Sequence, residues 1–363
     1  MLTYQIPLVP GPTRVHESVR RAYLTDYGSA DLEPEYLQLY VAVQGQLQAI
    51  LSTQTKIAVM TGEGMIALWG ALKSCIKPGD RVLAVSTGVF GYGIGEMAAT
   101  VGAQVRWVEF GYDEILRPDP VAQAIREFEP KMVTAVHCET PSGTLNPVDQ
   151  VGELVREQGV SLYYVDAVAS AAGAPVLVDE WGIDLCLIGT QKALSAFPDL
   201  AGVTVSPRAW DIIAEVDYAG YDALLPYRDA LEKAGFPYTP AWASLAALHE
   251  ACNLVLEEGL EQVFARHMEC AAQCRDRAHA MGLSLYPIDE AACSPTVTAL
   301  RVPEKLGWQK LDQRLREHGM VVGGSLGPLA GKVFRIGHMG AQADLALIDR
   351  GMDVLACVLG QGG

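Results

Sequence analysis

Residues 162–192 read LYYVDAVASAAGAPVLVDEWGIDLCLIGTQK, and this stretch decides the fold. Its two short apolar runs, 162–165 and 183–188, are bounded by glycine or turn residues, as expected for strands that are buried on both faces. The first run ends at Asp166, and the second is followed by Lys192. If the strands are parallel neighbours, both side chains emerge at the carboxyl edge of the sheet, where open α/β folds bind ligands.

A lysine amine beside a carboxylate is the pair that pyridoxal chemistry requires. The amine attaches the cofactor covalently, and the acid keeps the pyridine nitrogen protonated. The alternative is a surface Lys192 and a helix-capping Asp166 on an ordinary α/β domain.

The flanking sequence alternates between strand-like and helix-like segments. Strands are predicted at 56–60, 81–86, 104–110, 132–137 and 202–205, and helices near 35–50, 65–75, 91–101, 120–128, 241–256 and 260–281. This alternation predicts right-handed βαβ units and an α/β fold with a mostly parallel sheet. We expect an N-terminal arm over 1–14, a large domain over 15–257 and a smaller C-terminal α+β domain over 258–363. The smaller domain would contain strands near 296–302 and 333–336 and helices near 311–318 and 345–359.

The composition excludes several classes of function. Acidic residues outnumber basic ones by 43 to 27 in 363 residues, and no basic cluster breaks the excess, so we expect no nucleic-acid or membrane-surface partner. No apolar run is long enough to span a membrane, and the N-terminus lacks a signal peptide's features. The eight scattered cysteines are typical of a reducing compartment, which predicts a cytoplasmic protein.

Three motifs resemble those of the class V aminotransferases, in particular the alanine–glyoxylate and serine–pyruvate group. They are DAVAS at 166–170, GTQKAL at 189–194 and GKVFRIG at 331–337. The likeness runs in the family's order from Pro10 to Gly340. It implies the aspartate-aminotransferase-like fold of pyridoxal-phosphate enzymes (fold type I), with an N-terminal arm that lies across a partner subunit and approaches the active site.

The resemblance also implies a site, residue by residue. Lys192 would form the Schiff base with pyridoxal 5′-phosphate and then move a proton, while Asp166 would hold the pyridine nitrogen. Phe90 would stack on one ring face and Val168 would meet the other. The other implied contacts are Gly62, Glu63, Gly64, Met65 and Gln191 at the phosphate, Thr140 near the ring oxygen, and Thr239 from a partner subunit. A site completed across an interface implies a homodimer.

The substrate side of the implied site is Arg335, whose guanidinium would grip a carboxylate with two hydrogen bonds. Its alternative role is a structural ion pair within the small domain. Phe90 has an alternative as an ordinary core aromatic. The threonine–proline pairing at Thr140 leaves the exact hydroxyl residue open.

Two positions depart from the alanine–glyoxylate pattern. Glu63 stands where those enzymes have a small hydroxyl residue beside the phosphate, and Phe236 stands where they supply a partner-subunit tyrosine. Both departures predict weaker binding of pyridoxal phosphate. The alternative is that Glu63 points away from the pocket as a first-turn acid favoured by the helix dipole.

Two other motifs carry less weight. The glycines of 91–95 lack the GxGxxG spacing, so we interpret them as a glycine-rich helix start rather than a dinucleotide loop. His267, Cys270 and Cys274 share a helix face, but no partner motif completes a metal site, which favours packing. We therefore expect no metal.

The sequence thus predicts a pyridoxal-phosphate-dependent aminotransferase that moves an amino group from a small amino acid to a small 2-oxo acid such as pyruvate or glyoxylate. Three alternatives stay open. The chain resembles pyridoxamine–pyruvate aminotransferase closely enough that the unphosphorylated vitamer is a candidate substrate. A lyase on the same fold would use the same residues, and a nicotinamide dehydrogenase or a binding protein is the alternative from another class.

Overall fold

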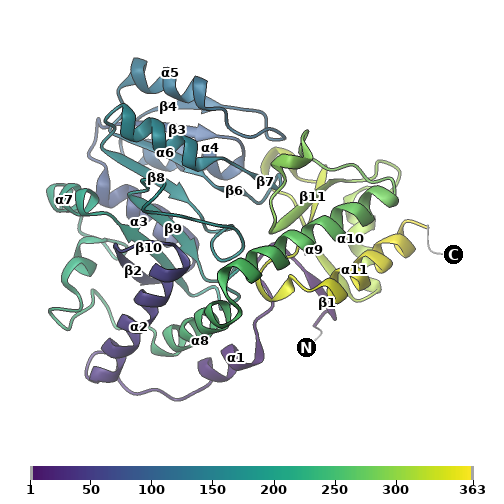
Figure 1. Ribbon diagram of the computed structural model, residues 1–363, viewed down its shortest axis with the longest axis horizontal. Helices are drawn as coiled ribbons and strands as arrows, with labels where there is room; N and C mark the ends of the chain where they lie inside the picture. Colours follow the sequence, from purple (N-terminus) through teal and green to yellow (C-terminus); the bar gives the residue numbers. More distant parts are fainter. Residues whose placement is uncertain (1–2, 361–363) are drawn as a thin grey trace.

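The computed structural model describes residues 3–360, which contain a large sheet, a small sheet and a two-stranded hairpin (Figure 1). The large sheet has seven strands in the order β2-β10-β9-β8-β5-β3-β4. In chain order they are β2 (Lys56–Thr61), β3 (Arg81–Ser86), β4 (Gln104–Glu109), β5 (Met132–Val136), β8 (Leu162–Asp166), β9 (Leu185–Gly189) and β10 (Leu200–Val205). The predicted α/β class with a mostly parallel sheet is confirmed.

The central strands are apolar throughout because both faces of the sheet are covered. In β8, Tyr163 and Val165 enter one hydrophobic core, while Leu162 and Tyr164 enter the core on the opposite face. All four side chains are completely buried. Since successive strand residues point to opposite faces, a strand between two helical layers must be apolar at every position.

One strand runs against the others. β10 pairs antiparallel with both β9 and β2. The chain returns from the end of β9 through the short segment 190–199, which leaves no room for a crossover helix, and a direct return makes the pair antiparallel.

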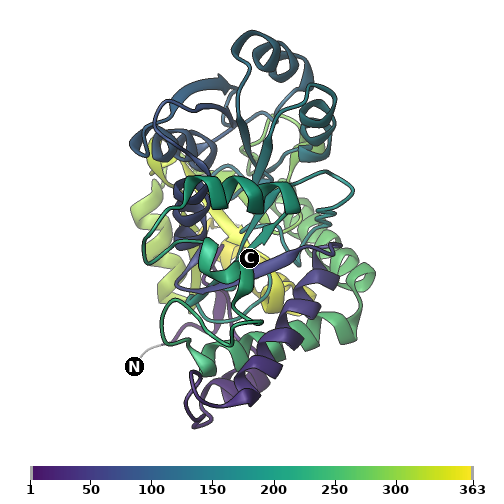
Figure 2. The ribbon, with the colours of Figure 1, turned by 90° about the vertical axis from the view of Figure 1, so that its left-hand side faces the viewer.

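Helices cover the large sheet on both sides (Figure 1). They are α2 (Pro34–Ile50), α3 (Gly64–Cys75), α4 (Val89–Thr100), α5 (Pro118–Phe128), α6 (Val148–Glu157), α7 (Pro207–Val216) and α8 (Trp242–Glu258). The short α1 (Glu17–Tyr23) and α2 both pack against α8, and Figure 2 shows this group of helices along one end of the molecule. A short hairpin, β6 (Cys138–Glu139) and β7 (Thr144–Leu145), follows β5.

The small sheet has the order β1-β12-β13-β11. Its strands are β1 (Ile6–Leu8), β11 (Val297–Arg301), β12 (Met320–Gly324) and β13 (Val333–Gly337), and its helices are α9 (Leu260–Ala280), α10 (Trp308–Glu317) and α11 (Leu345–Val358). Gly259 separates α8 from α9, next to the domain boundary expected at residues 257 and 258.

The N-terminal segment, which the sequence predicts as an arm, contains a strand. Ile6–Leu8 form β1, which pairs parallel with β12 in the small sheet, and an arm over 1–14 that lies across a partner subunit stays a prediction. Ile6 and Leu8 are buried in the core of the small domain, and this burial is what holds the strand in place. Figure 1 shows β1 beside the C-terminal elements. Met1 and Leu2, at the start of the expected arm, lie outside the described residues.

Candidate active site

Asp166 and Lys192 meet at the predicted edge of the large sheet. β8 and β9 are parallel neighbours, with Asp166 opposite Leu187, and Lys192 follows three residues after the end of β9. Both side chains line a cavity of about 210 Å³. The parallel pairing of two buried strands is therefore sufficient to bring the acid and the amine together.

Most of the predicted cofactor residues line this same cavity. Its lining is Glu63, Gly64, Met65, Leu68, Phe90, Cys138, Thr140, Asp166, Val168, Ala169, Gln191 and Lys192. Leu68, Cys138 and Ala169 were not predicted from the sequence, because their apolar neighbours are typical of an ordinary core. The helical period from Gly64 would have suggested Leu68, because residues four apart lie on one helix face.

The environment of Asp166 favours a cationic partner. Its side chain accepts a hydrogen bond from the Val168 amide at 2.8 Å. Burial raises the pKa of Asp166 to about 6, against the opposing effects of that hydrogen bond and of the Lys192 charge. A buried carboxylate whose pKa is raised gains most from a positive group placed beside it.

Lys192 is nearly enclosed, and its amine has a specific partner. Lys192 Nζ donates to the carbonyl oxygen of Pro10 at 2.6 Å. Burial, and then the positive charge of Arg335, lower the pKa of Lys192 to about 8. A lowered pKa increases the neutral, nucleophilic fraction of the amine near neutral pH.

Phe90 lies in the first turn of α4, which a buried acid caps. Glu139 is completely buried, and its carboxylate accepts hydrogen bonds from the amides of Phe90 at 3.2 Å and Gly91 at 2.7 Å. Burial raises the pKa of Glu139 to about 7. The expected glycine-rich helix start over 91–95 is thus part of α4, and Glu139 fixes the backbone that carries Phe90.

Thr140 follows Glu139 in the β6–β7 hairpin and lines the cavity. The nearby hydroxyl of Ser142 is engaged elsewhere, with the Glu139 carbonyl at 3.3 Å and with Thr144 at 2.9 Å. Of the two hydroxyls in this run, Thr140 is therefore the one that faces the cavity.

Glu63 faces the cavity and does not point away. It is the N-cap of α3, and its carboxylate accepts hydrogen bonds from the Met65 amide at 3.0 Å and from Gln191 Nε2 at 3.1 Å. These are two of the donors that the family resemblance assigns to a phosphate. Gln191 Oε1 is buried and has no hydrogen-bond partner among residues 3–360.

Three predicted residues do not line the cavity. Gly62 precedes it and donates its amide to the Asp199 carbonyl at 2.7 Å. Thr239 is exposed and its hydroxyl donates to Asp31 at 2.9 Å. The third is Arg335, on β13 of the small sheet.

Arg335 is buried without an acid. Its Nε donates to the Gly324 carbonyl at 2.9 Å, and Nη2 donates to the same oxygen. In the described part of the chain no carboxylate forms an ion pair with it, so the structure does not support the alternative of a structural ion pair. Burial lowers the pKa of Arg335 to about 10. A buried cation without a counter-ion is costly unless an anion binds to it.

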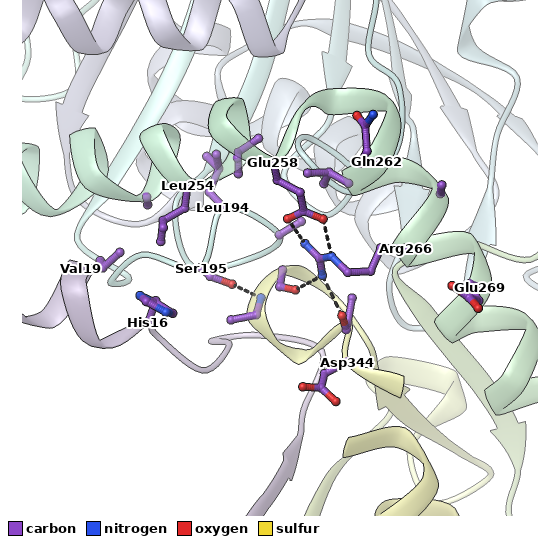
Figure 3. A pocket seen from close by; sticks show the side chains of 18 of the residues that line it. His16, Val19, Leu194, Ser195, Leu254, Glu258, Gln262, Arg266, Glu269 and Asp344 are labelled. Carbon is purple, nitrogen blue, oxygen red and sulfur yellow. Dashed lines mark hydrogen bonds and ion pairs between the residues drawn. The ribbon is translucent and has the colours of Figure 1, made fainter. Parts of the chain in front are cut away.

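A larger cavity of about 800 Å³ lies between α1, α8, α9 and the loop after β13. Figure 3 shows that Arg266 points into it, but this guanidinium already pairs with Glu258 at 2.6 Å and donates to the Gly340 and Ala343 carbonyls. Because the chain itself already supplies hydrogen-bond partners and a counter-ion to Arg266, this cavity is a weaker candidate for an active site than the cavity at Lys192.

The predicted packing role of the α9 residues matches their surroundings. His267, Cys270 and Cys274 are buried, and His267 contacts the Val263 carbonyl at 2.7 Å and accepts from the Gly340 amide at 2.9 Å. No group of three potential ligands within residues 3–360 is arranged to hold a metal ion.

The family model named aminotransferase class-V matches residues 12–332. The chain belongs to the class V aminotransferases. This membership confirms the predicted family and enzyme class and excludes the dehydrogenase alternative.

Named relatives cover nearly all of the chain. The pyridoxamine–pyruvate transaminase of Mesorhizobium japonicum is 34% identical over 93% of this chain and 87% of its own. The (S)-ureidoglycine–glyoxylate transaminase of Bacillus subtilis is 33% identical over 92% of this chain and 85% of its own. The crystal structure of the ureidoglycine–glyoxylate aminotransferase from B. subtilis has a TM-score of 0.95 at 32% identity and covers 100% of this chain and 94% of that one. The predicted fold type is confirmed.

Class V aminotransferases depend on pyridoxal phosphate, and the site fits one part of this cofactor better than the other. Phe90 and Val168 provide apolar walls, and Asp166 is a buried acid that a pyridinium would stabilise. At the other end, the Glu63 carboxylate occupies donors at the start of α3. The residues therefore fit the pyridine ring, while the phosphate end carries a negative charge.

Proposed function

We propose that this class V aminotransferase transfers an amino group from a small amino acid of the alanine or serine type to a small 2-oxo acid, pyruvate or glyoxylate. The observation that carries the proposal is the buried Arg335. Its positive charge lowers the pKa of Lys192, and no acid in the described chain forms an ion pair with it. Both substrates are carboxylates, and a guanidinium fork matches a carboxylate. The names of two relatives mention pyruvate and glyoxylate, which supports the same acceptors.

When bound, pyridoxal phosphate supplies an electron sink for the charge that proton loss leaves on the substrate Cα. The residues of the chain do the rest. Arg335 binds and orients the substrate carboxylate, and Lys192, as a free amine, accepts and returns the proton at Cα. Asp166 holds the proton of the pyridine nitrogen, and Phe90 and Val168 keep water from the ring.

The test is an assay with alanine or serine as donor and glyoxylate as acceptor, and with serine as donor and pyruvate as acceptor. We expect one equivalent of new amino acid for each 2-oxo acid consumed. Consumption of the amino acid without amination of an acceptor would reject this function and favour the lyase, which would use the same residues.

Glu63 favours a second candidate, in which the unphosphorylated vitamer is a substrate together with pyruvate. A carboxylate about 4 Å from a phosphate charge costs roughly 1 kcal/mol per charge pair in water and roughly 4 at an effective dielectric of 20. The unphosphorylated vitamer carries a neutral hydroxymethyl group in place of the phosphate. This group has no such electrostatic cost, because its hydroxyl can donate to Glu63 or to the unpaired Gln191 Oε1. Phe236 points to the same candidate: it packs against Tyr36 and Tyr40 of its own chain and offers no hydroxyl.

Replacement of Glu63 by serine separates the two candidates. Serine keeps an N-cap for α3 and removes the charge, so the dissociation constant of pyridoxal phosphate should fall about tenfold or more, while that of free pyridoxal should not improve. Titration of cofactor-free protein with each vitamer measures both constants, and Glu63→Gln tests the charge at nearly constant size. Tight phosphate-cofactor binding in the wild type, unchanged by Glu63→Ser, would dismiss the second candidate.

We further propose a homodimer with a site completed across the interface, in the cytoplasm. Thr239 is exposed and lies outside the cavity of its own chain, which supports a contribution to the partner's site. All eight cysteines are free, which supports a reducing compartment. No helix within residues 3–360 is long and apolar enough to cross a membrane. Light scattering of the purified protein measures the assembly, and a monomeric mass at full activity would reject the shared site.

A further inference from the structure

The segment Val9–Arg14, which we call the strap, connects β1 of the small sheet with α1 and passes directly over Lys192. Along the way it delivers the Pro10 carbonyl oxygen to Lys192 Nζ, at 2.6 Å. No side chain of the strap provides this contact. The position of the acceptor therefore depends on what holds the backbone of the strap.

One end of the strap is bonded to the loop that carries Lys192. The Thr13 amide donates to the Gln191 carbonyl at 3.0 Å. The Thr13 hydroxyl donates to the Lys192 carbonyl at 2.9 Å and lies 3.2 Å from the Ser195 hydroxyl. Ser195 in turn accepts from the Ala341 amide at 2.8 Å, a contact visible in Figure 3. The strap, the lysine loop and the loop after β13 thus form one bonded unit.

Gln342 binds both ends of the strap at once. Its Nε2 donates to the Val9 carbonyl and to the Gly337 carbonyl, each at 2.8 Å. Its Oε1 accepts from the Arg14 amide at 2.8 Å. The side chain is completely buried, and these three bonds use both amide protons and one oxygen lone pair. One carboxamide therefore fixes the strap to the end of the strand that carries Arg335.

Two glycines beside Arg335 make room for the strap. A Cβ at Gly337 would lie 2.3 Å from the Val9 carbonyl oxygen, and one at Gly323 would lie 2.7 Å from Pro10 Cδ. Gly323 is the register partner of Arg335 on β12. Within the strap, a Cβ at Gly11 would lie 2.6 Å from Lys192 Cδ and 2.7 Å from its Nζ. The strap is therefore closely packed between Lys192 and the strand that carries Arg335, with no space for an added Cβ at these glycines.

We propose that Gln342 is a positioning residue: by fixing the strap, it makes the Pro10 carbonyl the resting acceptor for the amine of Lys192 whenever that amine is not covalently bound. This inference rests on the proposed function, in which Lys192 is the reacting lysine. The released amine must stay near the substrate Cα and away from water, although the Arg335 charge repels it. The fixed Pro10 carbonyl keeps the amine near the substrate Cα, and the strap above it keeps water away.

The main test uses Gln342→Leu, which removes all three bonds, with Gln273→Leu as the matched control. Gln273 also donates from its side chain, to Asp349 on α11, away from the strap. In vitamer-free protein, acylation of each lysine by acetic anhydride is followed against pH by peptide mass spectrometry. Burial is the main cause of the low pKa of Lys192. If the strap no longer covers Lys192, the midpoint of the pH dependence of its acylation should therefore move from about 8 by at least one pH unit toward 10.5. Gln273→Leu should leave the midpoint in place.

A second variant covers the case in which Gln342→Leu does not fold. Gly11→Ala pushes against the lysine itself, and Gly79→Ala is its control, because both glycines have φ +91° and nothing lies within 4 Å of a Cβ at Gly79. The positive φ is thus matched, while the contact with Lys192 is present at Gly11 and absent at Gly79. Capture of pyridoxal by Lys192, trapped with borohydride, should be at least tenfold slower in Gly11→Ala only.

The kinetic signature separates positioning from general damage. For Gln342→Leu and Gly11→Ala we expect kcat to fall at least tenfold, with KM for the 2-oxo acid within about threefold, because both variants keep the bonds between Arg335 and the Gly324 carbonyl. An unchanged acylation midpoint in folded Gln342→Leu, or unchanged capture in Gly11→Ala, would overturn the inference while leaving the proposed function intact. Trapping of a different lysine would overturn both.

Discussion

Replacement of Lys192 by alanine should abolish amino-group transfer while the protein stays folded. Loss of the proton transfer at the substrate Cα alone accounts for roughly 10²–10⁴-fold in rate, and loss of the covalent attachment adds to it. Within residues 3–360 the Lys192 side chain forms one hydrogen bond, to the Pro10 carbonyl, and the bond from Thr13 to the Lys192 backbone carbonyl survives the substitution. Steady-state transamination at saturating substrate measures the effect, and thermal unfolding checks the fold.

The matched control for this variant is Lys310→Ala. Lys310 is an exposed lysine of α10 in the small domain, so its removal should leave the rate within a factor of two. Small primary amines added to Lys192→Ala should restore part of the activity if the missing group is the amine. Transamination at near wild-type rate in Lys192→Ala would remove the basis of the proposed function.

Replacement of Arg335 by alanine should raise KM for the carboxylate substrates far more than it weakens vitamer binding. Loss of a charged partner that leaves a carboxylate buried costs about 2–5 kcal/mol, which corresponds to a roughly 30-fold to several-thousand-fold higher KM. Arg335 does not line the cavity that holds Asp166 and Lys192, so the vitamer dissociation constant should change less than about threefold. Initial rates and direct titration measure the two quantities.

Two further variants make the Arg335 result specific. Arg335→Lys keeps the charge but loses the planar fork, so its KM should be intermediate. Arg301→Ala removes a half-exposed arginine from the neighbouring strand β11 and should leave KM unchanged. A KM for Arg335→Ala equal to that of the wild type would show that another residue binds the substrate carboxylate.

The sequence predicted those parts of the site that depend on one strand pair. Two short, mainly apolar runs, one ending in Asp166 and the other followed by Lys192, are enough to predict parallel neighbours and a shared edge. The helix start at Gly64 was likewise predictable, because a turn with two glycines precedes an apolar helical repeat. These features are local, and they require only the period of side chains along the chain.

Contacts between residues far apart in the sequence were not predicted. β1 is three residues long and is stabilised by packing in the small sheet, so no local pattern distinguishes it from an arm. Gln342 ends a short 3-10 helix, Gly340–Gln342, and its importance comes from its bond to Val9, more than three hundred residues away. The bond between Glu63 and Gln191 joins two loops. The sequence left the direction of Glu63 open, and only the fold shows that it faces the cavity.

The central claim is that Lys192 is the lysine that binds the pyridoxal ring. The most direct measurement is borohydride reduction of the protein loaded with pyridoxal phosphate, and separately with pyridoxal, followed by peptide mapping. We predict loss of the visible absorbance band and a single pyridoxyl modification, on Lys192, with at least one of the two vitamers. A modification on any other lysine, or none at all with a folded protein and saturating vitamer, would contradict the account.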